Sequence, residues 1–346
     1  MRRVLIIAVS VILMVLCSSC QRRPFAERQS KVAINLDIKT NIINHAEVEL
    51  PEDMRVDLYD PETAQLVYTD YVGPYGGYIR PEAGTYDMIV YSIGSESTII
   101  HNEHDYNEIE AYTNEVSAFI KSQLSHFLAK RALAAKERAA KKAAESQKAG
   151  FQTKEPEPYV EEPVVNQPDH IFVGWYHNLE IPVVYEHDDI KEIFVEVDAH
   201  TIVETWVVEI RNLEGARWIS SVAALVSGQR GSVHIGPNVA SEKVVSLYFD
   251  MGKNEDEEGR TVVTGKFNTF GHHPTRDDEI WIDLSVKDTG GSEHVFHFDV
   301  SDQFVDNEKR YILIEEPVVI EEPKVEGGGF QPIVEGWDDV ITDIIL

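Results

Sequence analysis

Two pairs of histidines are the first residues in this sequence whose type and spacing could support chemistry. Zinc sites usually combine histidine nitrogens with further histidine, cysteine or carboxylate ligands. His101 and His104 would point to opposite faces of an extended segment, because side chains alternate along a strand. His272 and His273 precede Pro274, a sequence typical of a loop. Neither pair predicts a metal site.

Signatures of catalysis are missing from the sequence as well. It has no His-Glu-x-x-His zinc motif, no Gly-x-Ser-x-Gly elbow and no glycine-rich phosphate loop with its lysine. Residues 250–258 include oxygen ligands for calcium but lack the spacing of a calcium loop, so a solvated hairpin tip is the better interpretation. We predict no catalytic residue, no metal ligand and no cofactor, which makes a hydrolase only the third choice of function.

Three tyrosines form the one cluster that indicates ligand binding. Tyr71, Tyr75 and Tyr78 lie around Gly73-Pro74 and Gly76-Gly77. Aromatic faces on a loop can stack on sugar rings or anchor a protein partner. We favour the structural interpretation, in which the three rings cover the end of the first domain.

Composition limits the remaining function classes. A chain of 346 residues is long enough for two domains, and its 43% hydrophobic content excludes a wholly disordered chain. The 31 Lys and Arg residues against 60 Asp and Glu residues give a formal charge of -29. A nucleic-acid binder must supply cations to the phosphates, so we exclude nucleic acid as a partner.

The N-terminus predicts export and lipid anchoring. Arg2 and Arg3 precede an apolar run over residues 4–16, which is too short to span a bilayer and fits a secretory signal. Ser18 and Ser19 before Cys20 resemble the lipobox of bacterial lipoproteins, which implies a signal peptide over 1–19, lipid attachment such as palmitate at Cys20, and a tether over 20–30. The alternative is an ordinary secretory signal. With its one remaining cysteine acylated, the mature chain could form no disulfide.

Residues 31–113 predict a first β-domain. Residues 32–38 alternate between apolar and polar, with the period of two of a half-buried strand. Residues 85–92 are apolar on both faces, which indicates a central strand of a sandwich.

Residues 114–150 predict a helical insert between the domains. Val116, Ile120, Leu124 and Phe127 are spaced as an apolar helix stripe, whereas the part beyond Leu133 is rich in Ala, Lys, Arg and Glu. We expect the first half to dock and the basic half to project as a solvated spacer; contact with an acidic partner or lipid phosphates is the alternative.

A Pro/Glu linker is predicted over residues 151–167. Its Glu-Glu-Pro-Val-Val sequence at 161–165 recurs at 315–319. Repeats of this composition are more often spacers than binding motifs.

Residues 168–316 predict a second β-domain. Ile193, Val195 and Val197 alternate with acidic residues, and residues 280–286 and 296–300 form an antiparallel hairpin around a turn at 288–291. We expect one face of that hairpin in water. The pattern as a whole predicts an all-β fold of two antiparallel sandwiches joined by the Ala/Lys-rich interdomain helix.

Several segments carry a family resemblance. Residues 76–91, 168–174, 267–271, 296–303 and 327–339 resemble the fimbrillin-like lipoproteins of Bacteroidales, and together they span nearly all of the mature chain. The resemblance implies two transthyretin-like β-sandwiches on an outer-membrane lipid anchor, akin to fimbrial anchor and tip subunits. Many members of that group have no assigned function.

The tail, residues 317–346, ends in an apolar strand. Its apolar positions are Trp337, Val340, Ile341, Ile344 and Leu346. An unpaired apolar strand would aggregate, so it must join a sheet, either as an edge strand of its own domain or as a strand donated to a neighbour.

These observations lead to one functional prediction. We expect a lipid-anchored outer-membrane protein that faces the cell exterior and acts as a fimbria-associated accessory or anchor subunit or adhesin, through β-strand addition and surface contacts with fimbrial subunits. The alternative is a non-polymerising surface lipoprotein that binds glycans or host proteins.

Overall fold

The computed structural model describes residues 31–32, 35–43, 48–148, 161–185, 188, 192–276, 279–304 and 307–323. Within this part the chain is mostly β, as predicted, and it forms two curled sheets, one near a barrel and one a half-barrel. The described residues divide into two compact units. Unit 1 draws on Met1–Gly94, His104–Asn107 and Phe172–His200, and unit 2 on Ser95–Glu103, Glu108–Ile171 and Thr201–Leu346.

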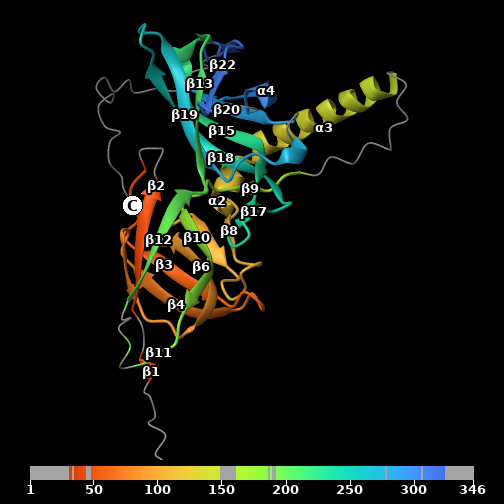
Figure 1. The fold of residues 1–346 in the computed structure, drawn as a ribbon. Helices are drawn as coiled ribbons and strands as arrows, with labels where there is room; N and C mark the ends of the chain where they lie inside the picture. The colour runs from red at the N-terminus through yellow and green to blue at the C-terminus, as the bar shows by residue number, and fades with distance from the viewer. Residues whose placement is uncertain are drawn as a thin grey trace, which may run out of the picture. The chain divides into compact units, whose positions relative to one another are not determined.

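Unit 1 is built on a seven-stranded sheet in the order β4-β3-β6-β10-β12-β2-β5 (Figure 1). Its strands are β2 (Asn35–Ile43), β3 (Met54–Tyr59), β4 (Leu66–Val72), β5 (Gly76–Ile79), β6 (Gly84–Ser92), β10 (Phe172–Ile181) and β12 (Glu192–Thr201). Strand β12 runs parallel to β2, and β5 runs antiparallel to β2 on its other side. The short strands β1 (Lys31–Val32) and β11 (Val184–Tyr185) pair separately.

The core of unit 1 follows from the predicted alternation. Leu36 and Ile38 on β2 are buried against Val195 and Val197 of β12 and apolar residues of the other strands. Strand β6 lies between β3 and β10, so the prediction of a central strand at 85–92 is confirmed.

The sheet of unit 1 differs from the predicted segments in one respect. Strands β10 and β12 fall within residues 168–316, which the sequence assigned to the second domain, yet they complete the sheet of the first. The physical reason is that the inner strands β6 and β2 each need hydrogen-bond partners on both sides, and β10 and β12 supply the partners beside β6 and β2.

Unit 2 is built on an eight-stranded sheet in the order β21-β20-β15-β18-β19-β13-β22, with β9 added to β18. Its strands are β9 (Val164–Val165), β13 (Glu204–Ile210), β15 (Ile219–Arg230), β18 (Val244–Glu255), β19 (Thr261–Thr269), β20 (Trp281–Asp288), β21 (Glu293–Asp299) and β22 (Tyr311–Ile314). Strands β20 and β21 form the predicted hairpin, in which Leu284 pairs with Phe296. One concave face carries the main core, with buried residues such as Phe249 and Phe267.

Smaller elements complete unit 2. They are a sheet in the order β17-β16-β8-β7, the pair β14-β23, and short helices. Their bounds are β7 (Thr98–His101), β8 (Glu110–Thr113), β14 (Leu213–Glu214), β16 (Ser232–His234), β17 (Val239–Ala240), β23 (Val318–Val319), η1 (Ala216–Trp218), η2 (Pro274–Arg276) and α4 (Ser301–Phe304).

The Glu-Glu-Pro-Val-Val repeat has a structural role in both copies. Val164–Val165 adds as β9 in parallel to β18, and Val318–Val319 adds as β23 in parallel to β14. Val165 and Val318 are both buried. The interpretation of the repeat as a spacer is therefore wrong for its Val-Val residues, which pair with strands of unit 2 in both copies.

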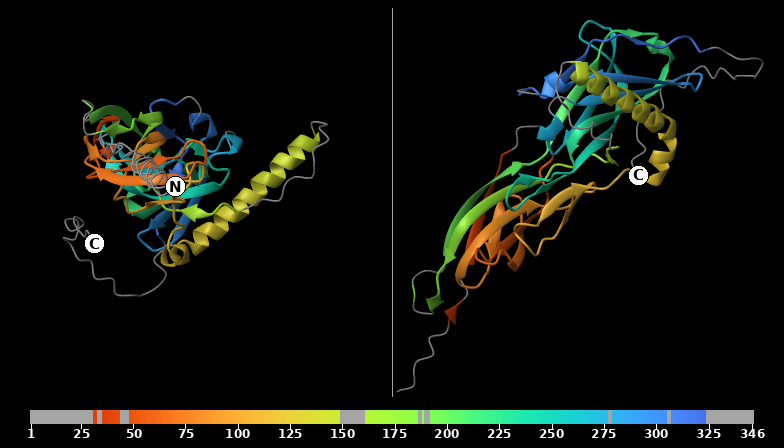
Figure 2. Two further views of the ribbon diagram at one scale, coloured as in Figure 1. Left: turned by 60° about the horizontal axis from the view of Figure 1, so that its bottom comes forward. Right: turned by 90° about the vertical axis from the view of Figure 1, so that its right-hand side faces the viewer.

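Two helices follow the predicted stripe. They are α2 (Ala118–Gln123), which Ser117 caps through its Oγ, and α3 (Ser125–Lys148). Val116, Leu124 and Phe127 pack on Leu225, which lies on the sheet face opposite the main core. The last turns of α3, yellow in Figures 1 and 2, extend beyond the sheet, as predicted for the basic half. Within the described residues no helix is long and apolar enough to cross a membrane.

A buried ion pair anchors α3 to the sheet. Arg131 is 4% exposed, and its Nε donates to Oδ2 of Asp283 on β20 at 2.6 Å. Asp283 is fully buried and also accepts from Nδ1 of His297 at 2.7 Å. Arg131 further donates to Ser246, whose Oγ donates to Oε2 of Glu162 at 2.6 Å. The prediction that one face of the β20-β21 hairpin lies in water is therefore wrong at Asp283.

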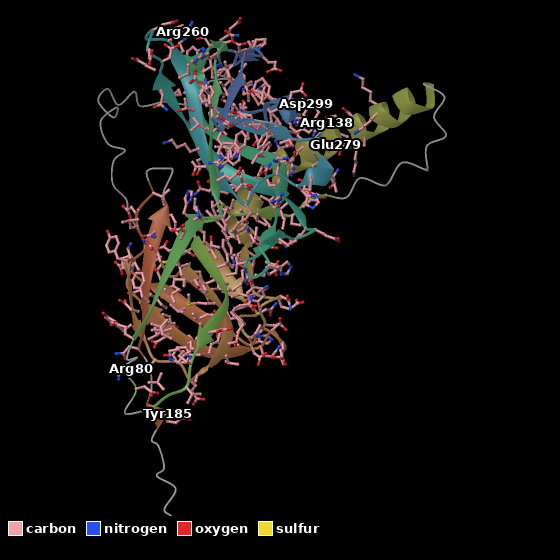
Figure 3. All side chains as sticks on the ribbon, in the orientation of Figure 1. Arg80, Arg138, Tyr185, Arg260, Glu279 and Asp299 are labelled. Carbon is pink, nitrogen blue, oxygen red and sulfur yellow. The ribbon has the colours of Figure 1, made fainter. Side chains whose placement is uncertain are left out.

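The contacts continue along α3. The Arg138 guanidinium lies 3.9 Å from the ring centroid of Trp281, and Nζ of Lys142 pairs with Glu279 at 2.7 Å. Figure 3 shows Arg138 and Glu279 beside the helix. The prediction of a purely solvated spacer is wrong for this part of the basic stretch. Its basic side chains form ion pairs with acidic residues of unit 2 and a cation–π contact with Trp281.

Candidate functional site

Some predicted site residues lie outside the described residues. They are Cys20 and the tail residues Trp337, Val340, Ile341, Ile344 and Leu346. Lipid attachment and the partner strand therefore stay predictions.

The three tyrosines flank one turn of unit 1. Tyr71 is on β4, Tyr75 is in the turn, and Tyr78 is on β5, with exposed fractions of 55%, 71% and 63%. Because β4 and β5 are the two ends of the strand order, this turn joins the two edges of the curled sheet. All three rings are more than half exposed, and whether they contact a ligand or a partner stays a prediction.

The turn is fixed by its backbone. The amide of Gly76 donates to the carbonyl of Gly73 at 2.9 Å, and the amide of Thr40 donates to the carbonyl of Tyr75 at 3.2 Å. Gly76 has a φ of 109°, and a Cβ built there would lie 1.8 Å from the carbonyl oxygen of Ile38. Only glycine permits this approach of β5 to β2.

The register places Tyr78 in a row with two residues of the neighbouring strands. Asp37 of β2 pairs with Tyr78 on one side and with Phe194 of β12 on the other. Residues directly opposite in neighbouring strands point to the same face, with Cβ atoms about 5 Å apart. Phe194 is 59% exposed, like Tyr78. We call Phe194, Asp37 and Tyr78 the aromatic row.

The polar residues beside the aromatic row are paired with one another. Lys39 pairs with Glu196 at 2.7 Å, and Asn41 donates to Glu196 at 2.7 Å and to Asp198 at 3.0 Å. The amide of Asn41 and then the ammonium of Lys39 lower the pKa of Glu196. Lys39 and Asn41 therefore bind carboxylates outside the aromatic row, those of Glu196 and Asp198.

The aromatic row itself is negatively charged. Asp37, and after it Glu192, raise the pKa of the Tyr78 phenol. The nearby Nε of Arg80 donates to the side chain of Asn35 at 2.9 Å. Across the part of the chain that the structure describes, no lysine or arginine forms an ion pair with Asp37 or Glu192. Both carboxylates accept a hydrogen bond from the Tyr78 phenol.

Sequence reasoning missed Phe194. The alternation of residues 192–198 puts Phe194 on the same face as Glu192 and Glu196, where an aromatic residue is out of place. An aromatic residue on a polar strand face could have marked Phe194 as a candidate contact residue. It did not indicate Tyr78 as a neighbour, because strand alternation does not reveal which strands pair.

The other candidates bind within the protein. Nε2 of His101 lies 2.6 Å from the carboxylate of Glu110, and Nδ1 of His273 lies 2.7 Å from Oγ1 of Thr275. In the predicted hairpin tip, the carboxylate of Asp256 accepts from backbone amides and pairs with Arg260 at 2.7 Å. Among the described residues, no three His, Cys, Asp or Glu side chains group as metal ligands.

Comparisons with known proteins give one matching family and several solved structures of similar fold. A family profile described as "Domain of unknown function (DUF5119)" matches residues 19–250. Comparison with curated proteins gives no match. A solved structure of a candidate adhesin from Bacteroides ovatus is 19% identical with a TM-score of 0.56, over 85% of this chain and 94% of that chain.

Weaker likenesses extend to two further solved structures. The fimbrial anchor protein Mfa2 from Porphyromonas gingivalis is 11% identical with a TM-score of 0.43, over 79% of this chain and 85% of that chain. A candidate polysaccharide-binding protein from Bacteroides thetaiotaomicron is 10% identical with a TM-score of 0.43, over 77% and 80%. The resemblance predicted from the sequence, to fimbrillin-like proteins of Bacteroidales, is confirmed.

Proposed function

We infer a function from the premise that the chain belongs to the family of the DUF5119 domain, a domain of unknown function. We propose that it is a lipid-anchored cell-surface protein, and that it works as a fimbria-associated accessory or anchor subunit or as an adhesin. The observation that carries the proposal is the fold it shares with a candidate adhesin over most of both chains. On this proposal each curled sheet is a variant of the transthyretin-like sandwich.

Lipid anchoring is supported by the sequence at residues 1–20. Acylation at Cys20 would hold the protein at the outer membrane, with the β units beyond it. Replacing Cys20 with Ser should move the protein from the outer-membrane fraction to the soluble fraction. If the Cys20→Ser protein stays with the membrane, the anchor is elsewhere.

Assembly by strand addition is supported by the edges of unit 1. In the described chain β4 pairs with β3 and β5 with β2, and between β4 and β5 only the bridge from Gly73 to Gly76 occurs. Such edges can accept a strand from another chain.

Immunogold labelling of cells should find the protein at filaments or their bases, and deletion of residues 336–346 should abolish higher oligomers. A deletion that lowers monomer stability and leaves the oligomers unchanged would instead mean that the tail pairs within its own chain.

Glycan or host-protein binding without polymerisation is the second candidate. The exposed tyrosines around the turn after β4 favour it. A glycan array with the full chain tests it, since binding should fall in the Tyr75→Ala and Tyr78→Ala variants. Binding that survives both substitutions rules this patch out.

A further inference from the structure

We propose that the aromatic row of Phe194, Asp37 and Tyr78 receives a lysine or arginine side chain from a basic segment of a protein partner. The proposal deepens the surface-contact part of the proposed function and rests on it. It concerns one face of unit 1 and needs none of the residues outside the described chain.

The row presents two exposed rings on either side of a carboxylate. Phe194 and Tyr78 stand on the strands either side of β2, so their Cβ atoms are about 10 Å apart, twice the strand spacing. In the described chain neither ring stacks on another aromatic ring. Both rings are more than half exposed, so the alkyl stem of an incoming lysine or arginine can lie along a ring while its charged head reaches the carboxylates of Asp37 and Glu192, to which the Tyr78 phenol hydrogen-bonds.

The charges around the row select a cation. The face of an aromatic ring is negative and attracts Lys and Arg, and the carboxylate of Asp37 adds a full charge. Among the described residues, Lys39 and Arg80 already have partners in Glu196 and Asn35. An anionic ligand would meet the carboxylates of Asp37 and Glu192 on a chain of formal charge -29.

A protein segment suits the site better than a small amine. One cation over exposed rings contributes only about 1 kcal/mol, which on its own gives no useful affinity. The exposed rings of Tyr75 and Tyr71 lie around the turn that follows β4 and precedes β5, the strand of Tyr78. A partner that delivers its cation on a longer segment can cover these rings as well and so add apolar contact.

A titration with two matched peptides tests the inference. The probe is a fluorescent peptide of alternating lysine and glycine, and its copy with every lysine acetylated is the uncharged control. With the full mature chain in detergent we expect the first peptide to bind and the acetylated one not to. Asp37→Asn and Phe194→Thr should each weaken binding about fivefold. Glu62→Gln removes one exposed negative charge from a turn of unit 1 and should leave binding unchanged.

Three results would overturn the inference. They are no binding of the lysine peptide, equal losses in Asp37→Asn and Glu62→Gln, and equal binding of the acetylated peptide. The second result would mean that net acidity attracts the peptide, and the third that the rings bind neutral ligands such as sugars. If cells still display the protein at filaments, any of these results removes this inference alone, whereas loss of surface display removes the proposed function.

Discussion

Replacing Arg131 with Met should detach α3 from the sheet of unit 2 at a predictable cost. The substitution keeps an unbranched apolar stem and removes the cation that faces the fully buried Asp283 at 2.6 Å. Removing one partner of a buried ion pair costs about 3–5 kcal/mol, because the remaining charge is left in a medium of low polarity. Asp283 would keep His297 at 2.7 Å and Arg138 at 3.8 Å, so we expect the lower end, about 3 kcal/mol.

A second substitution in the same helix provides the matched control. Lys136 is exposed on α3, so Lys136→Met makes the same change of charge and type but should shift the free energy of unfolding by less than about 0.5 kcal/mol. Urea unfolding followed by tryptophan fluorescence measures both variants, and hydrogen exchange in α3 shows whether the helix detaches. Equal free energies for Arg131→Met and Lys136→Met would refute the reasoning.

The same pair sets an acid limit on stability. Burial alone would raise the pKa of Asp283, but the hydrogen bond from His297 and the charge of Arg131 outweigh burial and hold it below the usual value. A lowered pKa in the folded state contributes stability at pH above about 4, and that contribution is lost as the pH falls further. The difference between wild type and Arg131→Met should therefore shrink below about pH 4.

Three further predictions concern other parts of the fold. Gly76→Ala should destabilise unit 1 by about 2 kcal/mol or more in thermal unfolding because of its φ of 109° and the clash with β2, whereas Gly252→Ala, with open space around it, should not. His170 is held between two threonine hydroxyls and burial lowers its pKa, so stability should fall as the pH drops below about 6.5, and His170→Gln should flatten that profile in urea titrations. Val318→Ala should cost about 2 kcal/mol in the same assay, against less than about 0.5 kcal/mol for Val319→Ala, because only Val318 is buried.

The face of each strand could be predicted from the sequence, but its neighbours could not. The alternation correctly indicated that Leu36, Ile38, Val195 and Val197 are buried. Nothing in that alternation shows that β12 pairs with β2 across more than a hundred residues, because any strand with a matching apolar face could do so. The place of residues 172–200 in unit 1 therefore required the structure.

The role of Arg131 was also present in the sequence as a mismatch. It follows Phe127 by four residues and Leu124 by seven, so it continues the apolar stripe of the helix. A second polar residue at an apolar position is Asp283, which lies between Ile282 and Leu284 in the hairpin strand β20. An arginine and an aspartate at such positions indicate a buried pair. The composition of the helix predicted a solvated spacer instead, because the neighbouring turns are rich in Lys and Ala.

The aromatic row is organised by backbone register, and this bears on how it can bind. Asp37 receives Phe194 through the parallel pairing with β12 and Tyr78 through the antiparallel pairing with β5. The close approach at Gly76 holds β5 in place, so the row exists before any partner arrives. A preformed row loses little conformational freedom on binding, which leaves more of the contact energy for affinity. Gly76→Ala should therefore weaken a partner that needs Tyr78, even at temperatures where unit 1 stays folded, while the Phe194–Asp37 pair keeps its register. Loss of binding equal to that of Asp37→Asn would mean that both rings are required, and no loss would mean that Phe194 and Asp37 suffice.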